Sequence, residues 1–96
     1  MRLYELPRSK EGLLLYIERT TPKIEIIFHK IDGMYSYCKN TEGEIIHINA
    51  STKIQISNRS EDLVAKSDRE LKIMLTEKEN TPYQLAQIAT EIYLRK

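Results

Sequence analysis

Two X-Gly dipeptides, Asp32-Gly33 and Glu42-Gly43, divide residues 23–56 into runs in which apolar and polar residues alternate. Alternation with a period of two is typical of strands that bury one face, and an X-Gly dipeptide between two such runs favours a tight hairpin. The spacing therefore predicts an antiparallel meander in the middle of the chain, and its register decides which side chains share a face.

If Asp32-Gly33 forms a two-residue loop, Phe28 lies opposite Tyr37. If Glu42-Gly43 does the same, Cys38 lies opposite His47, although a three-residue or bulged second loop would shift this register. The pairing predicts a core face made of Ile24, Ile26, Phe28, Tyr35, Tyr37, Ile46, Ile48 and Ala50. It predicts an outer face made of Glu25, Ile27, His29, Ile31, Met34, Ser36, Cys38, Ile45, His47 and Asn49.

Three further segments complete the predicted sheet. Arg2–Leu6 alternates briefly before Pro7, Leu13–Arg19 is rich in bulky apolar residues, and Lys53–Ile56 alternates again. Leu13–Arg19 would also suit a short helix. Five short strands with tight connections predict a small antiparallel barrel over residues 1–59. Two successive hairpins followed by a brief turn into a last strand resemble the small barrels of the Src-homology-3-like (SH3-like) type.

The character of the sequence changes to helical over residues 60–96. Ser67–Glu70 and Thr81–Gln84 are capping boxes, and the second has Pro82 at the first helical position. An apolar stripe at helical spacing follows, formed by Leu85, Ile88, Ala89, Ile92 and Tyr93. Leu71–Leu75 fits either a helix or a strand. The chain is thus predicted to be an α+β protein, a single folding unit whose C-terminal helices pack on the barrel or on a partner.

Composition limits the functions that such a chain can have. Its 96 residues carry 15 basic and 14 acidic side chains, a net charge of +1, which excludes a strongly basic nucleic-acid footprint but not a local patch. A chain this short favours a binding or regulatory module over an enzyme. The single cysteine and the lack of a signal peptide predict a cytoplasmic location. The longest apolar run, Leu13–Ile17, is too short to cross a membrane.

The predicted outer face collects five polar side chains: His29, Ser36, Cys38, His47 and Asn49. A histidine beside a cysteine can favour the thiolate, so a small thiol enzyme using Cys38 and His47 is a minor hypothesis. The favoured interpretation is that these are ordinary residues of a half-buried sheet, with no catalytic role. The short ligand spacings of metal sites are missing, so no metal and no cofactor are predicted.

Nucleic-acid binding is the main alternative function. Tyr35, Tyr37 and Phe28 lie among basic residues, as the aromatic residues of stacking platforms do, with Lys23, Lys30 and Lys39 as candidate contacts. The predicted register places these aromatic rings in the core, where packing explains them. Other basic residues of the first half, including Arg8 and Lys10, could still gather at one end of the barrel.

The leading hypothesis is a non-enzymatic protein-interaction module that binds a protein partner or forms a homodimer. The apolar stripe supports this hypothesis, because a small barrel fills its own interior and leaves the apolar face of the last helix to be buried elsewhere. The candidate partner-binding residues are Ile88, Ile92 and Tyr93.

The segment around Asp32–Cys38 resembles small accessory proteins of T-even-like tailed bacteriophages. The resemblance implies an accessory or host-takeover protein that acts in the host cytoplasm, by binding rather than by catalysis. It assigns no functional residues.

Overall fold

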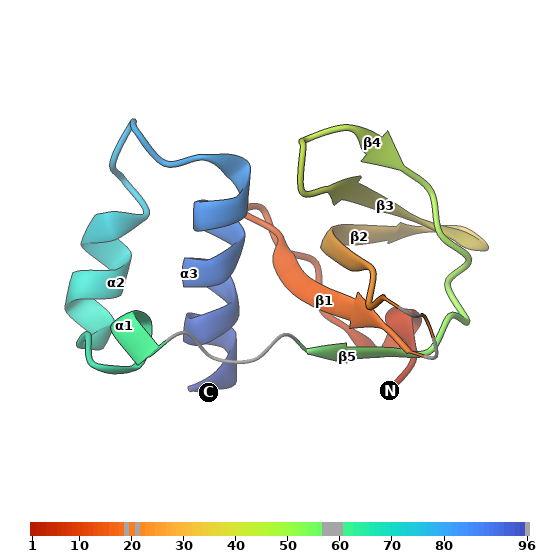
Figure 1. Ribbon diagram of the computed structural model, residues 1–96, viewed down its shortest axis with the longest axis horizontal. Helices are drawn as coiled ribbons and strands as arrows, with labels where there is room; N and C mark the ends of the chain where they lie inside the picture. Colours follow the sequence, from red (N-terminus) through yellow and green to blue (C-terminus); the bar gives the residue numbers. More distant parts are fainter. Residues whose placement is uncertain (19, 21, 57–60, 96) are drawn as a thin grey trace.

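The computed structural model describes residues 1–18, 20, 22–56 and 61–95, and it shows an α+β fold, as predicted (Figure 1). The strands are β1 (Leu13–Ile17), β2 (Glu25–Asp32), β3 (Tyr35–Asn40), β4 (Ile45–Ile46) and β5 (Ile54–Ile56). The helices are the 3-10 helix η1 (Leu3–Glu5) and the α-helices α1 (Glu61–Val64), α2 (Asp68–Met74) and α3 (Pro82–Leu94). The strands form one antiparallel sheet in the order β4-β3-β2-β1-β5.

The sheet is not a closed barrel, so the predicted closure is wrong. β4 and β5 are its two edges, and residues 48–54 run from one edge to the other. The predicted first strand is also wrong, since Leu3–Glu5 form η1 and only Arg2 makes an isolated bridge, to Lys53. The reason is packing: a 3-10 turn directs both Leu3 and Leu6 into the core, which alternation would not.

The first hairpin differs from the predicted register by one residue in its turn. Gly33 and Met34 form the two-residue loop, and Asp32 pairs with Tyr35. Gly33 has a φ of 67°, which suits the first position of such a loop. A β-bulge between Phe28 and Lys30 then places Phe28 opposite Cys38.

This bulge exchanges the two faces of β3 relative to the prediction. Ser36 and Cys38, predicted outside, are fully buried, whereas Tyr35 is 54% exposed and Tyr37 is half-buried on the outer face. Ile31, also predicted outside, packs against the core. The β2 residues Ile26 and Phe28 keep their predicted inward places, because the bulge restores the alternation beyond it.

The second hairpin has the three-residue loop that would shift the register. The Asn40 N–H donates to the Glu44 carbonyl, and Gly43 in the loop has a φ of 90°. Cys38 therefore pairs with Ile46, and His47 lies beside Tyr37 rather than beside Cys38.

The main core lies under the inner face of the sheet and is closed by η1. Its buried members are Leu3, Leu6, Leu13, Leu15, Ile26, Phe28, Cys38 and Ile54. Burial of this many large side chains, at about 1.5–3 kcal/mol each, is the main favourable term for folding.

Helix α3 lies between the sheet and the two shorter helices (Figure 1). Ala86 packs against Leu14 and Ile27 on the outer face. Because β5 pairs only with residues 15–17 of β1, the Leu14 N–H is left for α3, where it donates to Thr90 Oγ1 at 2.8 Å. Thr90 and Glu91 are buried by the packing around α3.

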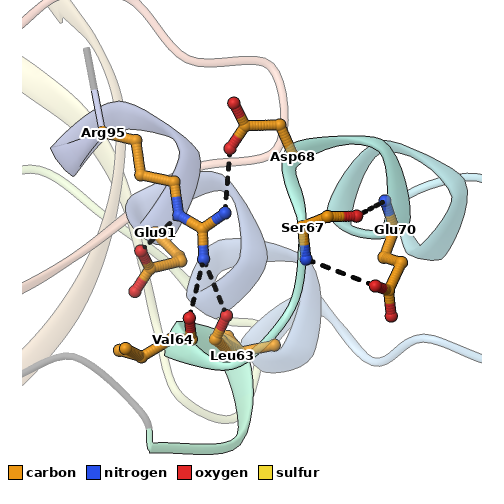
Figure 2. A network of polar contacts seen from close by, with 7 residues as sticks. All are labelled: Leu63, Val64, Ser67, Asp68, Glu70, Glu91 and Arg95. Carbon is orange, nitrogen blue, oxygen red and sulfur yellow. Dashed lines mark hydrogen bonds and ion pairs between the residues drawn. The ribbon is translucent and has the colours of Figure 1, made fainter.

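Arg95 connects the end of α3 to α1 and α2 (Figure 2). Its guanidinium donates to Glu91 Oε2 and Asp68 Oδ1, both at 2.8 Å, and to the carbonyls of Leu63 and Val64. Four acceptors around one planar group fix the relative position of three helices.

Both predicted capping boxes are present at the helix starts. Ser67 and Thr81 each accept a backbone N–H three residues later. The ambiguous Leu71–Leu75 segment lies mostly within α2, with Leu71 fully buried against Leu63. The predicted boundary between residues 59 and 60 lies outside the described residues.

Candidate functional site

Three rings cross the outer face of the sheet from strand to strand. His29 of β2, Tyr37 of β3 and His47 after β4 have centroids 5.6 Å and 6.4 Å apart, with interplanar angles of 71° and 69°. We call these three residues the aromatic row. Such edge contacts between rings are favourable and hold each ring in place.

The β-bulge builds the basic side of this row. Neighbouring residues in a regular strand point to opposite faces, but at the bulge both His29 and Lys30 reach Tyr37. Lys30 Nζ lies 5.9 Å from the centre of the Tyr37 ring, within the range of a cation–π contact. Lys39, two residues after Tyr37, is close enough to His29 to affect its titration. The row therefore has two cations beside it.

Both imidazoles are fixed by the same kind of hydrogen bond. His29 Nδ1 lies 3.2 Å from the Ser9 carbonyl and His47 Nδ1 lies 3.1 Å from the Ser36 carbonyl. Because a carbonyl can only accept, Nδ1 carries the proton in each ring. Nε2 is then the nitrogen available to accept a hydrogen bond, or to donate one once protonated.

Burial lowers the pKa of His29 below its usual value near 6.5, and the charge of Lys39 acts in the same direction. The bond to Ser9 and the charge of Glu11 oppose this shift without cancelling it. His29 is consequently neutral at neutral pH, and the positive charge of the site comes from lysine and arginine.

The segment before β1 completes the site. Arg8, Ser9, Lys10, His29, Lys30 and Tyr37 line an open hollow. The Ser9 N–H donates to the His29 carbonyl at 2.8 Å, so Ser9 and His29 are joined by two hydrogen bonds. Gly12 allows this approach: its φ is +93°, and a Cβ there would overlap Ile27 Cγ2.

The five residues of the predicted polar cluster do not come together. His29 and His47 lie on the outer face, and Asn49 Oδ1 accepts from Ser51 in a turn. Ser36 and Cys38 lie on the inner face, where Ser36 Oγ is 3.1 Å from Cys38 Sγ. Burial raises the pKa of the Cys38 thiol, with the Ser36 contact opposing it. Cys38 and His47, on opposite faces, do not form a nucleophile and base pair.

The three predicted basic contacts separate into two groups. Lys30 and Lys39 lie at the aromatic row, whereas Lys23 lies beyond the other end of β2, with its Nζ 5.4 Å from the Tyr16 ring centre. The predicted register placed Tyr37 in the core, whereas Arg8 and Lys10 were named only among basic residues that could gather at one end of the barrel. Tyr37 lies on the outer face because the β-bulge between Phe28 and Lys30 reverses the face of β3 relative to Phe28.

The predicted partner-binding residues pack within the chain. Ile88 is 2% exposed among Leu63 and Leu71, and Ile92 packs against the same cluster. Tyr93 packs against the main core. The stripe thus packs mostly against this chain's own structure, which leaves little of the surplus surface that favoured a protein partner.

Among the residues that the structure describes, no group of three or more histidine, cysteine or acidic side chains is placed to hold a metal ion. None of the described helices has the length and hydropathy of a membrane span. Comparisons with protein-family models, with curated proteins and with solved structures found no match to this chain.

Proposed function

We propose that this protein is a non-enzymatic binding module for single-stranded nucleic acid, and that the outer face of β2 and β3 is its binding surface. The observation that carries the proposal is the aromatic row with Lys30 against its central ring. Proteins that bind single strands combine aromatic rings, on which bases stack, with cations that follow the phosphates.

The charges around the row have the sign that the ligand needs. Arg8 and Lys10 line the hollow with Tyr37, Lys30 stands beside the Tyr37 ring, and the charge of Lys39 acts on His29. Each phosphate that such a cation neutralises releases counterions, so binding is stronger at low salt. A net charge of +1 for the whole chain is compatible with this arrangement because four of its cations, Arg8, Lys10, Lys30 and Lys39, lie near the row.

The histidines suit base recognition. Each ring is held through Nδ1, and the Nε2 of an imidazole held in this way can accept hydrogen bonds such as those from the amino groups of bases. Single-stranded bases expose these edges, whereas a duplex hides them in pairs and grooves.

A protein-interaction role is less well supported, since the stripe on α3 is buried. The large apolar residues that remain most exposed include Met34 and Ile45, at opposite ends of β3. The proposed binding role also agrees with a phage accessory or regulatory protein in the host cytoplasm. The strand order, with β5 beside β1, supports an SH3-like topology for this open sheet.

The test is fluorescence anisotropy with labelled single-stranded DNA and RNA of about eight nucleotides, a typical site size. We expect binding at low salt that weakens as salt rises and exceeds duplex binding. Stacking is worth about 1–3 kcal/mol per base, so Tyr37→Ala should weaken binding roughly 5- to 150-fold.

Two control variants match the test variants in residue type. Tyr4 is 56% exposed on η1, away from the row, so Tyr4→Ala should bind normally. Lys30→Ala should weaken binding and lower its salt dependence, whereas Lys23→Ala should do neither. No binding by the folded protein at low salt, or an equal loss in Tyr37→Ala and Tyr4→Ala, would refute the proposal.

A further inference from the structure

Residues 7–11 form a wall with a hollow on each side. One side is the hollow at Tyr37. On the other side, this wall faces α3 and the end of α2 across a groove. The groove is lined by Pro7–Glu11 and Leu13, and opposite them by Leu75, Ala89, Ile92 and Tyr93. Arg8, Ser9 and Lys10 line both hollows, so the two are adjacent.

The two sides of the groove differ in chemistry. Leu75, Ile92 and Tyr93 provide an apolar and aromatic side and are only partly buried by the rest of the chain. The charged residues that line the groove, Arg8, Lys10 and Glu11, all stand on the wall. An apolar surface beside an aromatic ring suits a flat base, and the cations of the wall suit the phosphate next to it.

The wall is held in position before any ligand binds. Ser9 makes its two hydrogen bonds to His29, and Ser9 Oγ accepts the Gly12 N–H at 3.1 Å. A fixed wall between two hollows keeps both open at a constant separation, which lowers the entropy cost of binding a ligand that spans them.

We propose, resting on the function proposed above, that the groove is a second base subsite of the same single strand. The strand crosses the wall with its phosphate at Arg8 and Lys10. One base stacks at Tyr37 and a neighbouring base enters the groove beside Tyr93.

Glu11 gives this subsite a preference among bases. Its carboxylate repels phosphate and accepts hydrogen bonds, so it favours a base that presents an exocyclic amino group. Cytosine, adenine and guanine have this group, and thymine and uracil lack it. The subsite therefore favours these three bases over thymine.

The experiment measures the affinities of oligo-dC and oligo-dT from one to about eight nucleotides, within known site sizes. We expect affinity for dC to rise at least tenfold at the length that first reaches both hollows. Tyr93→Leu keeps an apolar side chain against the core and should remove this step while changing the affinity of the shortest ligands less than twofold. Glu11→Ala should bring the dC to dT ratio of the longer ligands close to one.

The outcomes separate the two proposals. One outcome is that oligonucleotides bind and Tyr37→Ala weakens their binding, while affinity rises smoothly with length and Tyr93→Leu leaves the affinity of the longer oligonucleotides unchanged. This outcome refutes the second subsite and leaves the proposed function standing. An unchanged dC to dT ratio in Glu11→Ala, which removes a surface charge from a folded chain, would refute the role of Glu11. If no oligonucleotide binds, the proposed function fails and the subsite with it.

Discussion

Gly12 is the position at which a single methyl group tests the packing of the candidate site. Its φ of +93° is one that other residues rarely adopt, and a Cβ there would overlap Ile27 Cγ2 and lie 3.4 Å from the His29 ring. Gly12→Ala therefore carries two costs, one for the backbone and one for the clash.

Gly43 separates these two costs. It has a similar φ of +90°, but nothing lies within 4 Å of the position that a Cβ would occupy. A side chain in this backbone region costs about 1–2 kcal/mol, so Gly43→Ala should lower the free energy of unfolding by about that amount. Gly12→Ala adds overpacking of about 1–3 kcal/mol, for a total of about 2–5 kcal/mol.

Urea denaturation, followed by circular dichroism, measures the difference. With an m-value of about 1.5 kcal/mol/M for a chain of this size, the two midpoints should differ by roughly 0.7–2 M. Gly12→Ala should also weaken oligonucleotide binding, because its clash with Ile27 shifts residues 7–12, and Ser9 in this segment holds the ring of His29. Equal midpoints for the two variants would show that residues 7–12 do not approach β2 as described, and the site would lose its wall.

Three further predictions concern Cys38, His29 and Arg95. Because Cys38 is buried and its thiol pKa is raised, iodoacetamide at pH 7.5 should alkylate Cys38 far more slowly in the folded protein than in urea. Equal alkylation rates would place Cys38 on the surface. The pKa of His29 is lowered in the fold, so the unfolded chain takes up its proton first as pH falls below about 6.5, and the free energy of unfolding decreases there. His29→Gln should remove part of this slope between pH 7.5 and 5.5, and an unchanged slope would contradict the assignment. Arg95→Lys should lower the melting temperature, because an ammonium cannot reach all four acceptors of the guanidinium. Lys66→Ala breaks only an exposed 4.0 Å pair with Glu70 and should leave the melting temperature unchanged. Equal effects of the two variants would contradict the helix-anchoring role of Arg95.

The sequence contained the elements but not the register of the sheet. The hairpin positions, the capping boxes and the last helix follow from local patterns of two to five residues, which act within one element. Whether the first loop begins at Asp32 or at Gly33 changes the β2 partner of each β3 residue by two and keeps its face. The β-bulge between Phe28 and Lys30 reverses the face, and it places Ser36 and Cys38 in the core.

The bulge at His29 could not be read from a local pattern. It arises because Ile26, Phe28 and Ile31 must all face the core, although Phe28 and Ile31 are three residues apart. Strict alternation places only one of these two inside, and one extra residue on the outer face satisfies both. The candidate site is the consequence, since this residue is His29.

The fate of the apolar stripe also depended on tertiary structure. Periodicity showed that Ile88 and Ile92 must be buried, but it could not show that α1 and α2 would cover them. The same wrapping buries Thr90, whose hydroxyl completes the hydrogen bonding of β1. A single sequence identifies which surface needs a partner, whereas the fold decides whether the partner is the chain itself.

The most direct test of the account is a nuclear magnetic resonance titration of the ¹⁵N-labelled protein with oligo-dC at low salt. We predict that the largest amide shifts fall on residues 8–11, 29–30, 37–39 and 47, the wall and the aromatic row. Shifts confined to the β5 edge or to the exposed side of α2, or no shifts at all, would contradict the claim that this face binds single-stranded nucleic acid.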